Sequence, residues 1–258
     1  MQLDYASLNT FPKHNGVYIL SEITDEFESV YLKVRDREKR VYSDEELKHL
    51  PFPTENNPHI DEWKLRAKSF LRFKNYIKSR NERIKLLDLG CGNGWFCGQM
   101  AKYFDHDFYG IDVNLKELEQ ARNVFNSNKI NFIYADIFSI DFFTKPVEII
   151  TINAAAQYFP NIKILITKLF NFLNPSGELH IIDTPFYTAK EVEKAKKRTE
   201  SYYKSIGFPE MAKNYFHHSL TDISEFKTDL LYNPNSLFKR ITNTIINDSP
   251  FPWIRIKK

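Results

Sequence analysis

The chain has 258 residues, of which 42% are hydrophobic, enough for one α/β domain with an additional segment and a large buried core. Its formal net charge of +3, from 36 basic and 33 acidic residues, is too near balance for a dedicated nucleic-acid binder and favours a small-molecule partner. With only Cys91 and Cys97 and no run of about 20 apolar residues, the sequence predicts a reduced, cytoplasmic protein without a membrane-spanning segment.

Residues 1–80 are predicted to form an N-terminal extension of helices and a hairpin. The segments SVYLKV and RVYS flank the polar turn RDREKR, a pattern that predicts a β-hairpin over residues 29–43. Ser43 precedes Glu46 by the three residues of a capping box and predicts a short helix there. From Asp61 to about Arg80, apolar residues recur at three- and four-residue steps and predict an amphipathic helix. We expect this extension to be a lid over the site, with a recognition module or a dimerisation arm as alternatives.

From residue 84 the chain alternates predicted strands and helices. The strands are IKLLDLG (84–90), DFYGIDV (107–113), INFIYADI (130–137), VEIITINA (147–154) and GELHIID (177–183), followed by two in the tail, FKTDLLYN (226–233) and FPWIRIKK (251–258). The intervening helices are predicted at 94–104, 114–126 and 161–173. Apolar strands alternating with amphipathic helices predict an α/β fold, a doubly wound, mostly parallel seven-stranded sheet with helices on both faces. The last strand is placed to insert antiparallel beside the sheet.

The stretch LLDLGCGNGW, residues 86–95, places three glycines directly after a buried strand. Ligands of open α/β sheets bind outside the carboxyl ends of the strands, which is where Gly90, Gly92 and Gly94 are predicted to lie. Glycine admits positive φ and lets a ligand approach without meeting a Cβ, while the following helix presents unpaired N–H groups. The loop therefore suits a nucleotide-like ligand, although an ordinary strand-to-helix turn uses glycines in the same way.

Two carboxylates are predicted at the ends of the next two strands. Asp112 ends YGIDV, where it is placed to accept hydrogen bonds from both hydroxyls of a ribose. Asp136 ends FIYAD, where it is placed to accept one from an exocyclic amine such as that of adenine. Taken alone, each acid could instead be a helix N-cap or a solvated surface side chain. Their order after the glycine loop favours a ligand site over coincidence.

Taken together, these motifs resemble those of the class I S-adenosylmethionine-dependent methyltransferases. LLDLGCGNG resembles the first motif of that family, YGIDV the second and YADI the third. ITINAAAQYF and LNPSGELHIID resemble the regions of its fourth and fifth strands. The likeness covers roughly residues 84–185 and is weaker for the last two strands. It implies a Rossmann-like fold and S-adenosylmethionine as the cofactor.

The resemblance also implies which residues bind the cofactor. The methionine portion is implied to contact Asp88, Gly90, Cys91, Gly92 and Gly94. The ribose is implied to contact Asp112, and the adenine Val113, Asp136 and Ile137. The backbone carbonyl of Asn153 is implied to meet the methionine amino group. If the extension is a lid, Arg66 reaches the methionine carboxylate; the alternative is an arginine on the solvated face of its helix.

A nicotinamide dinucleotide is the alternative ligand for the glycine loop. Its G-x-G-x-x-G fingerprint also precedes an acidic residue by about 20 positions. Here the third glycine, Gly94, falls one residue early, and Asp136 has no role in that fingerprint. The dehydrogenase interpretation is therefore disfavoured.

The methyl acceptor is expected to bind a long excursion, residues 184–224, between the fifth and sixth strands. The candidate pocket residues are Tyr158, Asp183, Tyr187, Tyr202 and Tyr203. The tyrosines of this segment are placed to clasp a cationic amine, or else they only pack in the core. His217 and His218 are the candidates for a general base because histidine titrates near neutrality; packing or surface roles are the alternative.

No metal site is predicted, because the chain has no HxxxH or CxxC element and no tight acidic cluster. Asp183 is the residue best placed to join a magnesium site if one exists. The tetrapeptide NAAA at 153–156 lacks the Pro-Pro-aromatic sequence usual in methylases of planar amino groups, which disfavours an adenine or glutamine amide as acceptor.

The functional hypothesis is an S-adenosylmethionine-dependent methyltransferase acting on an oxygen or nitrogen of a small molecule, with its methyltransferase domain over residues 81–258. An RNA or protein methyltransferase is the alternative within the enzymes. A catalytically inactive cofactor-binding or scaffold protein is the alternative of another class. Nucleic acid and membrane are not expected as partners, and the oligomeric state is left open.

Overall fold

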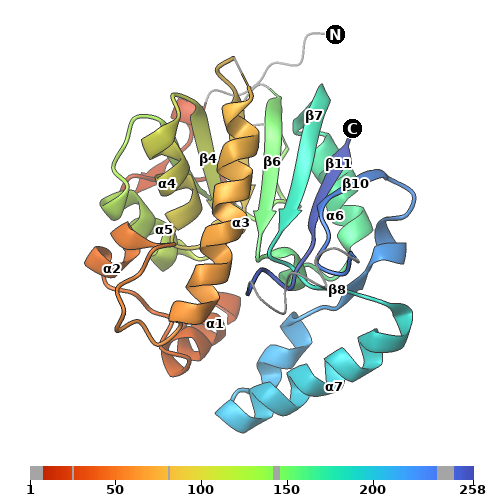
Figure 1. Ribbon diagram of the computed structural model, residues 1–258. Coiled ribbons are helices and arrows are strands. Elements are labelled where there is room, and N and C mark those ends of the chain that lie inside the picture. The colour runs from red at the N-terminus through yellow and green to blue at the C-terminus, as the bar shows by residue number, and fades with distance from the viewer. Residues whose placement is uncertain (1–7, 25, 81, 142–145, 237–246) are drawn as a thin grey trace.

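A central sheet of nine strands organises the computed structural model, which describes residues 8–24, 26–80, 82–141, 146–236 and 247–258. The strand order is β1-β2-β5-β4-β3-β6-β7-β11-β10 (Figure 1). The strands are β1 (Lys13–His14), β2 (Val17–Ile19), β3 (Lys85–Leu89), β4 (Asp107–Asp112), β5 (Ile130–Tyr134), β6 (Val147–Asn153), β7 (Leu173–Ile182), β10 (Lys227–Tyr232) and β11 (Trp253–Lys257).

The pairing directions confirm the predicted doubly wound sheet. Strands β2, β5, β4, β3, β6 and β7 are mutually parallel, and their carboxyl ends meet at one edge. The C-terminal strand β11 inserts antiparallel between β7 and β10, as its position in the sequence predicted. The glycine loop after β3 therefore lies at the centre of the sheet, where a ligand reaches it from the carboxyl edge.

The prediction of seven strands was two short, because a small hairpin in the extension joins the sheet. β1 and β2 pair antiparallel, and β2 continues the sheet in parallel beside β5, with Tyr18 opposite Ile133. The turn between them is Asn15-Gly16, with φ of 47° and 82°, the dipeptide favoured in two-residue hairpins. This turn signal was present in the sequence, but strands of two and three residues are too short for alternation to reveal.

The hairpin predicted over residues 29–43 was wrong: this segment contains helix α1 (Glu26–Arg37) and the turn that follows it. The reason is a helical spacing that the alternation test overlooked. Phe27, Val30, Tyr31 and Val34 recur at three- and four-residue steps and pack in one cluster with Tyr203 and Met211 from the excursion. The predicted capping box was confirmed, because Ser43 and Glu46 begin helix α2 (Asp44–His49) with both reciprocal hydrogen bonds.

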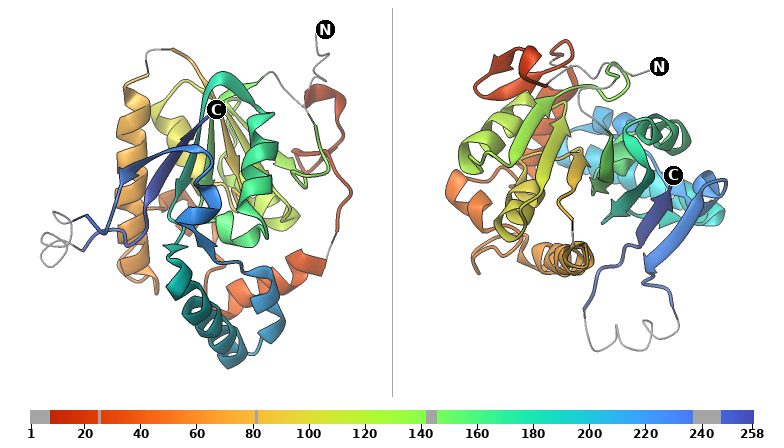
Figure 2. Two further views of the ribbon diagram at one scale, coloured as in Figure 1. Left: turned by 90° about the vertical axis from the view of Figure 1, so that its right-hand side faces the viewer. Right: turned by 90° about the horizontal axis from the view of Figure 1, so that it is seen from above.

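Helices cover both faces of the sheet, and Figure 2 shows α3 and α6 on opposite sides of it. The apolar stripe of α3 (Ile60–Lys78) joins α4 (Trp95–Tyr103) and α5 (Leu115–Val124) in one buried core on the first face. On the other face, α6 (Ile162–Phe170) buries its apolar residues against the sheet. The helix predicted from Asp61 thus belongs to the body of the domain, and its amino-terminal turns reach the carboxyl edge of the strands.

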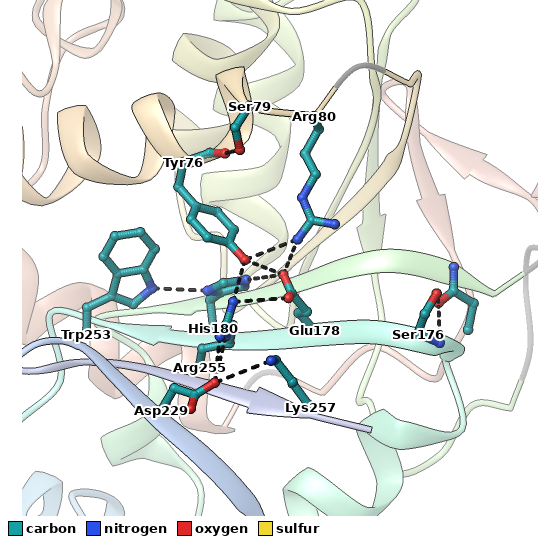
Figure 3. Close-up of polar contacts among 11 residues, drawn as sticks. Tyr76, Ser79, Arg80, Ser176, Glu178, His180, Asp229, Trp253, Arg255 and Lys257 are labelled. Carbon is teal, nitrogen blue, oxygen red and sulfur yellow. Dashed lines mark hydrogen bonds and ion pairs between the residues drawn. The ribbon is translucent and has the colours of Figure 1, made fainter.

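A buried carboxylate ties α3 to the C-terminal half of the sheet (Figure 3). Glu178 on β7 accepts hydrogen bonds from the hydroxyl of Tyr76, at 2.6 Å, and from Arg80. Arg255 on β11 joins it from the opposite side, at 3.4 Å. The neighbouring His180 accepts a hydrogen bond at Nδ1 from the indole of Trp253, at 3.1 Å. These contacts fix α3 on the sheet from which the site is built.

The excursion after β7 folds over the carboxyl edge of the sheet. Its main element is α7 (Ala189–Ile206), which lies with α1 beyond the strand ends in Figure 1. The shorter elements are β8 (Phe186–Tyr187), η3 (Pro209–Asn214), β9 (His218–Ser219) and η4 (Leu220–Ile223), and η2 (Ala156–Tyr158) precedes α6. In the parts of the chain that the structure describes, no helix combines the length and the apolar character needed to cross a membrane.

Candidate functional site

The glycine loop between β3 and α4 has a backbone that only glycine adopts readily. Gly90, Gly92 and Gly94 have φ of 71°, 51° and 70°. A Cβ on Gly90 would lie 2.4 Å from the Cβ of Ala155, and one on Gly92 would lie 3.1 Å from Glu117 Oε2. The loop is thus packed closely against the start of the η2 segment on one side and against α5 on the other.

Asp88 is a buried anchor beneath this loop. Its carboxylate accepts a hydrogen bond from the hydroxyl of Thr151 at 2.6 Å, and the Cys97 thiol lies 3.9 Å away. Burial raises the pKa of Asp88 to about 7 against the effect of the Thr151 hydrogen bond. Asp88 still lines the cavity next to the loop, so a cationic ligand group placed there would stabilise its ionised form.

Asp112, at the end of β4, is held by backbone groups. Its Oδ2 accepts a hydrogen bond from the N–H of Gly92 at 2.7 Å, and its Oδ1 accepts one from the N–H of Asn114 at 2.9 Å. Burial raises the pKa of Asp112, although these hydrogen bonds act in the opposite direction. Each oxygen retains a lone pair, so the carboxylate can accept two further hydrogen bonds from a ligand.

Two adjoining cavities bring the predicted cofactor residues together. The strand-end cavity, of about 350 Å³, is lined among others by Asp112, Val113, Asp136 and Ile137. The inner cavity, of about 100 Å³, is lined among others by Asp88, Cys91, Asn153 and Arg66. Gly90, Gly92, Tyr31, Ala154 and Tyr158 line both. Gly94 lines neither of the two; it turns the chain into α4, and a Cβ there would clash with Phe132 at 2.6 Å.

The residues of these cavities fit S-adenosylmethionine. The strand-end cavity is a mainly apolar slot with carboxylates at its edges, as an adenosine requires. In the inner cavity the side-chain oxygens of Asn153 and Gln157 are buried without a hydrogen-bond partner, so polar groups are available for a ligand amine. Arg66 donates a hydrogen bond to Glu62 at 2.9 Å and lies over the Trp63 ring, with its guanidinium at the same cavity.

The cavities also contain residues that the sequence analysis missed. Glu117, in the first turn of α5, lines the inner cavity, and burial raises its pKa to about 7. Its position three residues after the helix N-cap Asn114, close to Asp112, was a signal that could have been used. Phe27, Tyr31 and Arg35 line the cavities from α1. They were missed because their segment was interpreted as a hairpin.

The predicted acceptor tyrosines lie in part around a third cavity. Tyr158, Tyr202 and Tyr203 line this outer cavity, of about 370 Å³, which shares Arg35, Arg40, Arg66 and Tyr158 with the inner one. Tyr187 lies instead against the ring of His217, with centroids 5.5 Å apart. Asp183 accepts hydrogen bonds from Ser69 at 2.6 Å and Ser249 at 3.3 Å, and burial raises its pKa.

The two candidate histidines line a separate groove of about 750 Å³ between α6, α7 and η4. Nε2 of His218 is hydrogen-bonded to the carbonyl oxygen of Ala156 at 3.0 Å, so the imidazole must be a donor there. Nε2 of His217 lies 2.9 Å from the hydroxyl of Thr199. Burial lowers the pKa of both histidines. Their role as a base stays a prediction, which requires the acceptor to extend into this groove.

Comparison with known proteins adds a family to this geometry. A family model described as a methyltransferase domain matches residues 80–235, more than half of the chain. The matched range runs from the end of α3 through β10 and contains the glycine loop, Asp112 and Asp136.

Three curated relatives are methyltransferases whose names give different methyl acceptors. The chain is 29% identical over 168 residues to the phosphoethanolamine N-methyltransferase of Plasmodium falciparum, covering 58% of this chain and 61% of that protein. It is 23% identical over 154 residues to the sterol 24-C-methyltransferase of Debaryomyces hansenii, covering 57% and 40%. It is 27% identical over 100 residues to the malonyl-[acyl-carrier protein] O-methyltransferase of Priestia megaterium, covering 38% of this chain and 36% of that protein. The chain thus spans about a third to three fifths of these relatives.

Solved structures share the fold. The YcgJ protein of Bacillus subtilis superimposes with a TM-score of 0.55 at 15% identity, covering 74% of this chain and 98% of that one. A methyltransferase of Haloferax volcanii, solved with the Trm112 activator, has a TM-score of 0.55 at 12% identity, covering 92% and 98%. At these identities the likeness concerns the fold alone.

Proposed function

The chain belongs to the methyltransferase domain family, and from that premise we propose that it transfers a methyl group from S-adenosylmethionine to an oxygen or nitrogen of a small molecule. The observation that carries the proposal is the continuous pair of cavities at the carboxyl edge of the sheet. They bring the bare glycine loop, Asp112 and the unpartnered Asn153 side chain to one place. Three features that a cofactor site requires thus line the same pair of adjoining cavities.

The chain's own residues bind and orient in this proposal. S-adenosylmethionine supplies, when bound, a methyl group already activated on a sulfonium. Asp112 accepts hydrogen bonds from the ribose hydroxyls, and Ile137 and Val113 enclose the adenine. The rings of Tyr31 and Tyr158, with centroids 5.7 Å apart, line both cavities, so that they shield the bound cofactor from water. Positioning of the acceptor then supplies much of the rate.

An acceptor that must lose a proton needs a base, and two places supply candidates. His217 and His218 are the candidates from the sequence. Glu117 is the candidate that the cavities add, because its pKa of about 7 matches proton transfer near neutrality. Since Glu117 lies beside Gly92, it also competes for the role of a ribose ligand.

A small acceptor is supported by the size of the outer cavity, about 370 Å³, which residues of α1, α3 and α7 line. The names of the relatives cover nitrogen, oxygen and carbon acceptors, so they do not choose among these atoms.

The test has two stages. Titration calorimetry with S-adenosylmethionine and S-adenosylhomocysteine should show binding of both to the wild-type protein, and labelled methyl transfer should then be measured on small-molecule, RNA and protein fractions. Binding without transfer to any fraction would favour the inactive scaffold. Methyl transfer to RNA or protein alone would show that the acceptor is not a small molecule. If the protein bound neither compound, both the methyltransferase proposal and the alternative of an inactive cofactor-binding protein would be rejected.

A further inference from the structure

The outer cavity carries an excess of positive charge. Four arginines line it, Arg35, Arg40, Arg66 and Arg198, against two acids, Glu38 and Glu62, which leaves two positive charges. The tyrosines expected to clasp a cationic amine therefore stand beside guanidinium groups. A positively charged acceptor group would be repelled at this place.

The two acids are already used by two of the arginines. Arg40 binds Glu62 at 2.5 Å and Glu38 at 3.3 Å. Arg66 binds Oε1 of Glu62 at 2.9 Å, and Arg40 also donates a hydrogen bond to this oxygen. These contacts hold the turn after α1 and helix α3 together at the cavity, and they occupy both of the carboxylates that line it.

Like Arg198, Arg35 forms no ion pair with a carboxylate of the described residues, and of these two Arg35 is the one that also lines the inner cavity. Its Nε is buried without a hydrogen-bond partner, and among the described residues no carboxylate forms an ion pair with it. Its guanidinium lies 5.7 Å from the centre of the Tyr31 ring, at the junction of the inner and outer cavities. Glu117 on α5 lines the inner cavity together with Arg35 and attracts it, but the two side chains do not form an ion pair. A guanidinium stays protonated, and a buried one needs an anion.

We propose that the methyl acceptor carries a carboxylate or a phosphate and that Arg35 binds this group from the outer cavity. The inference rests on the proposed function and narrows its substrate class. A planar guanidinium binds two oxygens of such a group at once, so Arg35 also sets the orientation of the acceptor. The methionine carboxylate of the cofactor has the same chemistry, and Arg66 at the inner cavity is the residue expected to take it.

The test uses inorganic phosphate as the probe on the complex of the protein with S-adenosylhomocysteine. Calorimetry at constant ionic strength should show phosphate binding to the wild-type complex and at least tenfold weaker binding to Arg35→Gln. The matched control is Arg37→Gln, an exposed arginine on the same helix, which should stay within twofold of wild type. If Arg35→Gln does not fold, Arg35→Lys is the second variant, because it keeps the positive charge but lacks the planar guanidinium that binds two oxygens at once.

A second measurement tests whether Arg35 binds an anionic group of the acceptor or the methionine carboxylate of the cofactor. It compares the binding of S-adenosylhomocysteine with that of 5′-methylthioadenosine, which lacks the amino-acid portion. Because Arg35 also lines the inner cavity, support for the inference requires that Arg35→Gln weaken phosphate binding more than it weakens S-adenosylhomocysteine binding. If Arg35→Gln loses S-adenosylhomocysteine but keeps methylthioadenosine, Arg35 serves the cofactor and the inference is overturned. Equal phosphate binding by wild type and Arg35→Gln, or none by wild type, also overturns it. Failure of the wild-type protein to bind S-adenosylhomocysteine is the separate result that rejects the proposed function.

Discussion

Asp112 accepts a hydrogen bond from the backbone N–H of Gly92 at 2.7 Å, so the end of β4 holds the loop that follows β3. The contact joins the carboxylate expected to bind the ribose to the glycine expected to lie under the methionine portion. A change at either residue therefore acts on both halves of the cofactor site.

Replacing Asp112 by Ala should weaken S-adenosylhomocysteine binding by about 1.5 to 3 kcal/mol, the scale of hydrogen bonds to a charged group. Calorimetry measures the affinity. Asp141→Ala, at an acid whose side chain is 93% exposed and which lies next to α6, is the control and should bind as wild type does. Unchanged affinity of Asp112→Ala would show that the ribose is bound elsewhere.

Replacing Gly92 by Val should abolish cofactor binding. The branched side chain enters the cavity toward Glu117 and resists the φ of 51°. Gly207→Val is the matched control, because Gly207 also has a positive φ, 91°, with nothing within 4 Å of an added Cβ. Both variants should lose stability from backbone strain, by about 1 to 2 kcal/mol, and only Gly92→Val should lose binding. Wild-type affinity in Gly92→Val would mean that the loop is only a turn.

His217→Ala should leave S-adenosylhomocysteine affinity unchanged, since His217 lines the separate groove and not the cofactor cavities. If His217 is the base, methyl-transfer turnover should fall by roughly 10²-fold or more. His14→Ala, at an exposed histidine on the hairpin, controls for unspecific effects. Turnover within twofold of wild type would remove His217 from the reaction.

Acid should destabilise the fold through Glu178 and His180. Burial opposes ionisation of Glu178, but its contacts with His180, Tyr76 and Arg80 outweigh it and lower the pKa to about 2, from an ordinary 4.5. The unfolded chain therefore binds the proton more readily, and the stability from ionised Glu178 is present above pH 4.5 and lost as the pH falls toward 2. Burial also lowers the pKa of His180, which acts in the same direction from its ordinary 6.5 downward.

Denaturant unfolding between pH 7 and pH 3 measures this dependence. Glu178→Gln should be less stable than wild type at pH 7 and should lose less stability on acidification. Tyr76→Phe should cost at least about 1.5 to 3 kcal/mol at pH 7, because it removes the hydrogen bond to the charged carboxylate and also those that the hydroxyl accepts from Arg80 and Arg255. An unchanged pH slope in Glu178→Gln would assign the acid sensitivity to other groups.

The sequence by itself determined the parallel sheet, its helices and the residues at the strand ends. These features are local: buried strands, helical stripes and glycine turns are each specified within about ten neighbouring residues, and the topology of alternating elements then brings the strand ends to one edge. Asp112 and Asp136 were located in this way, Asp88 and Asn153 were implied by the resemblance of their motifs to a known family, and the structure places all four around the adjoining cavities.

The tertiary structure alone decided what closes the site. The helical stripe of α1 is polar enough to be mistaken for a hairpin, and its apolar face is explained only by residues such as Tyr203 and Met211 about 170 positions away. Between 123 and 180 positions separate Arg35 from the tyrosines of the outer cavity, so no local pattern joins them. Sequence spacing predicts the pair of Glu62 with Arg66 four residues later in one helix, but not that Arg40 shares this carboxylate or that no carboxylate of the described residues pairs with Arg35, because such ion pairing depends on which charged side chains the packed elements bring within reach.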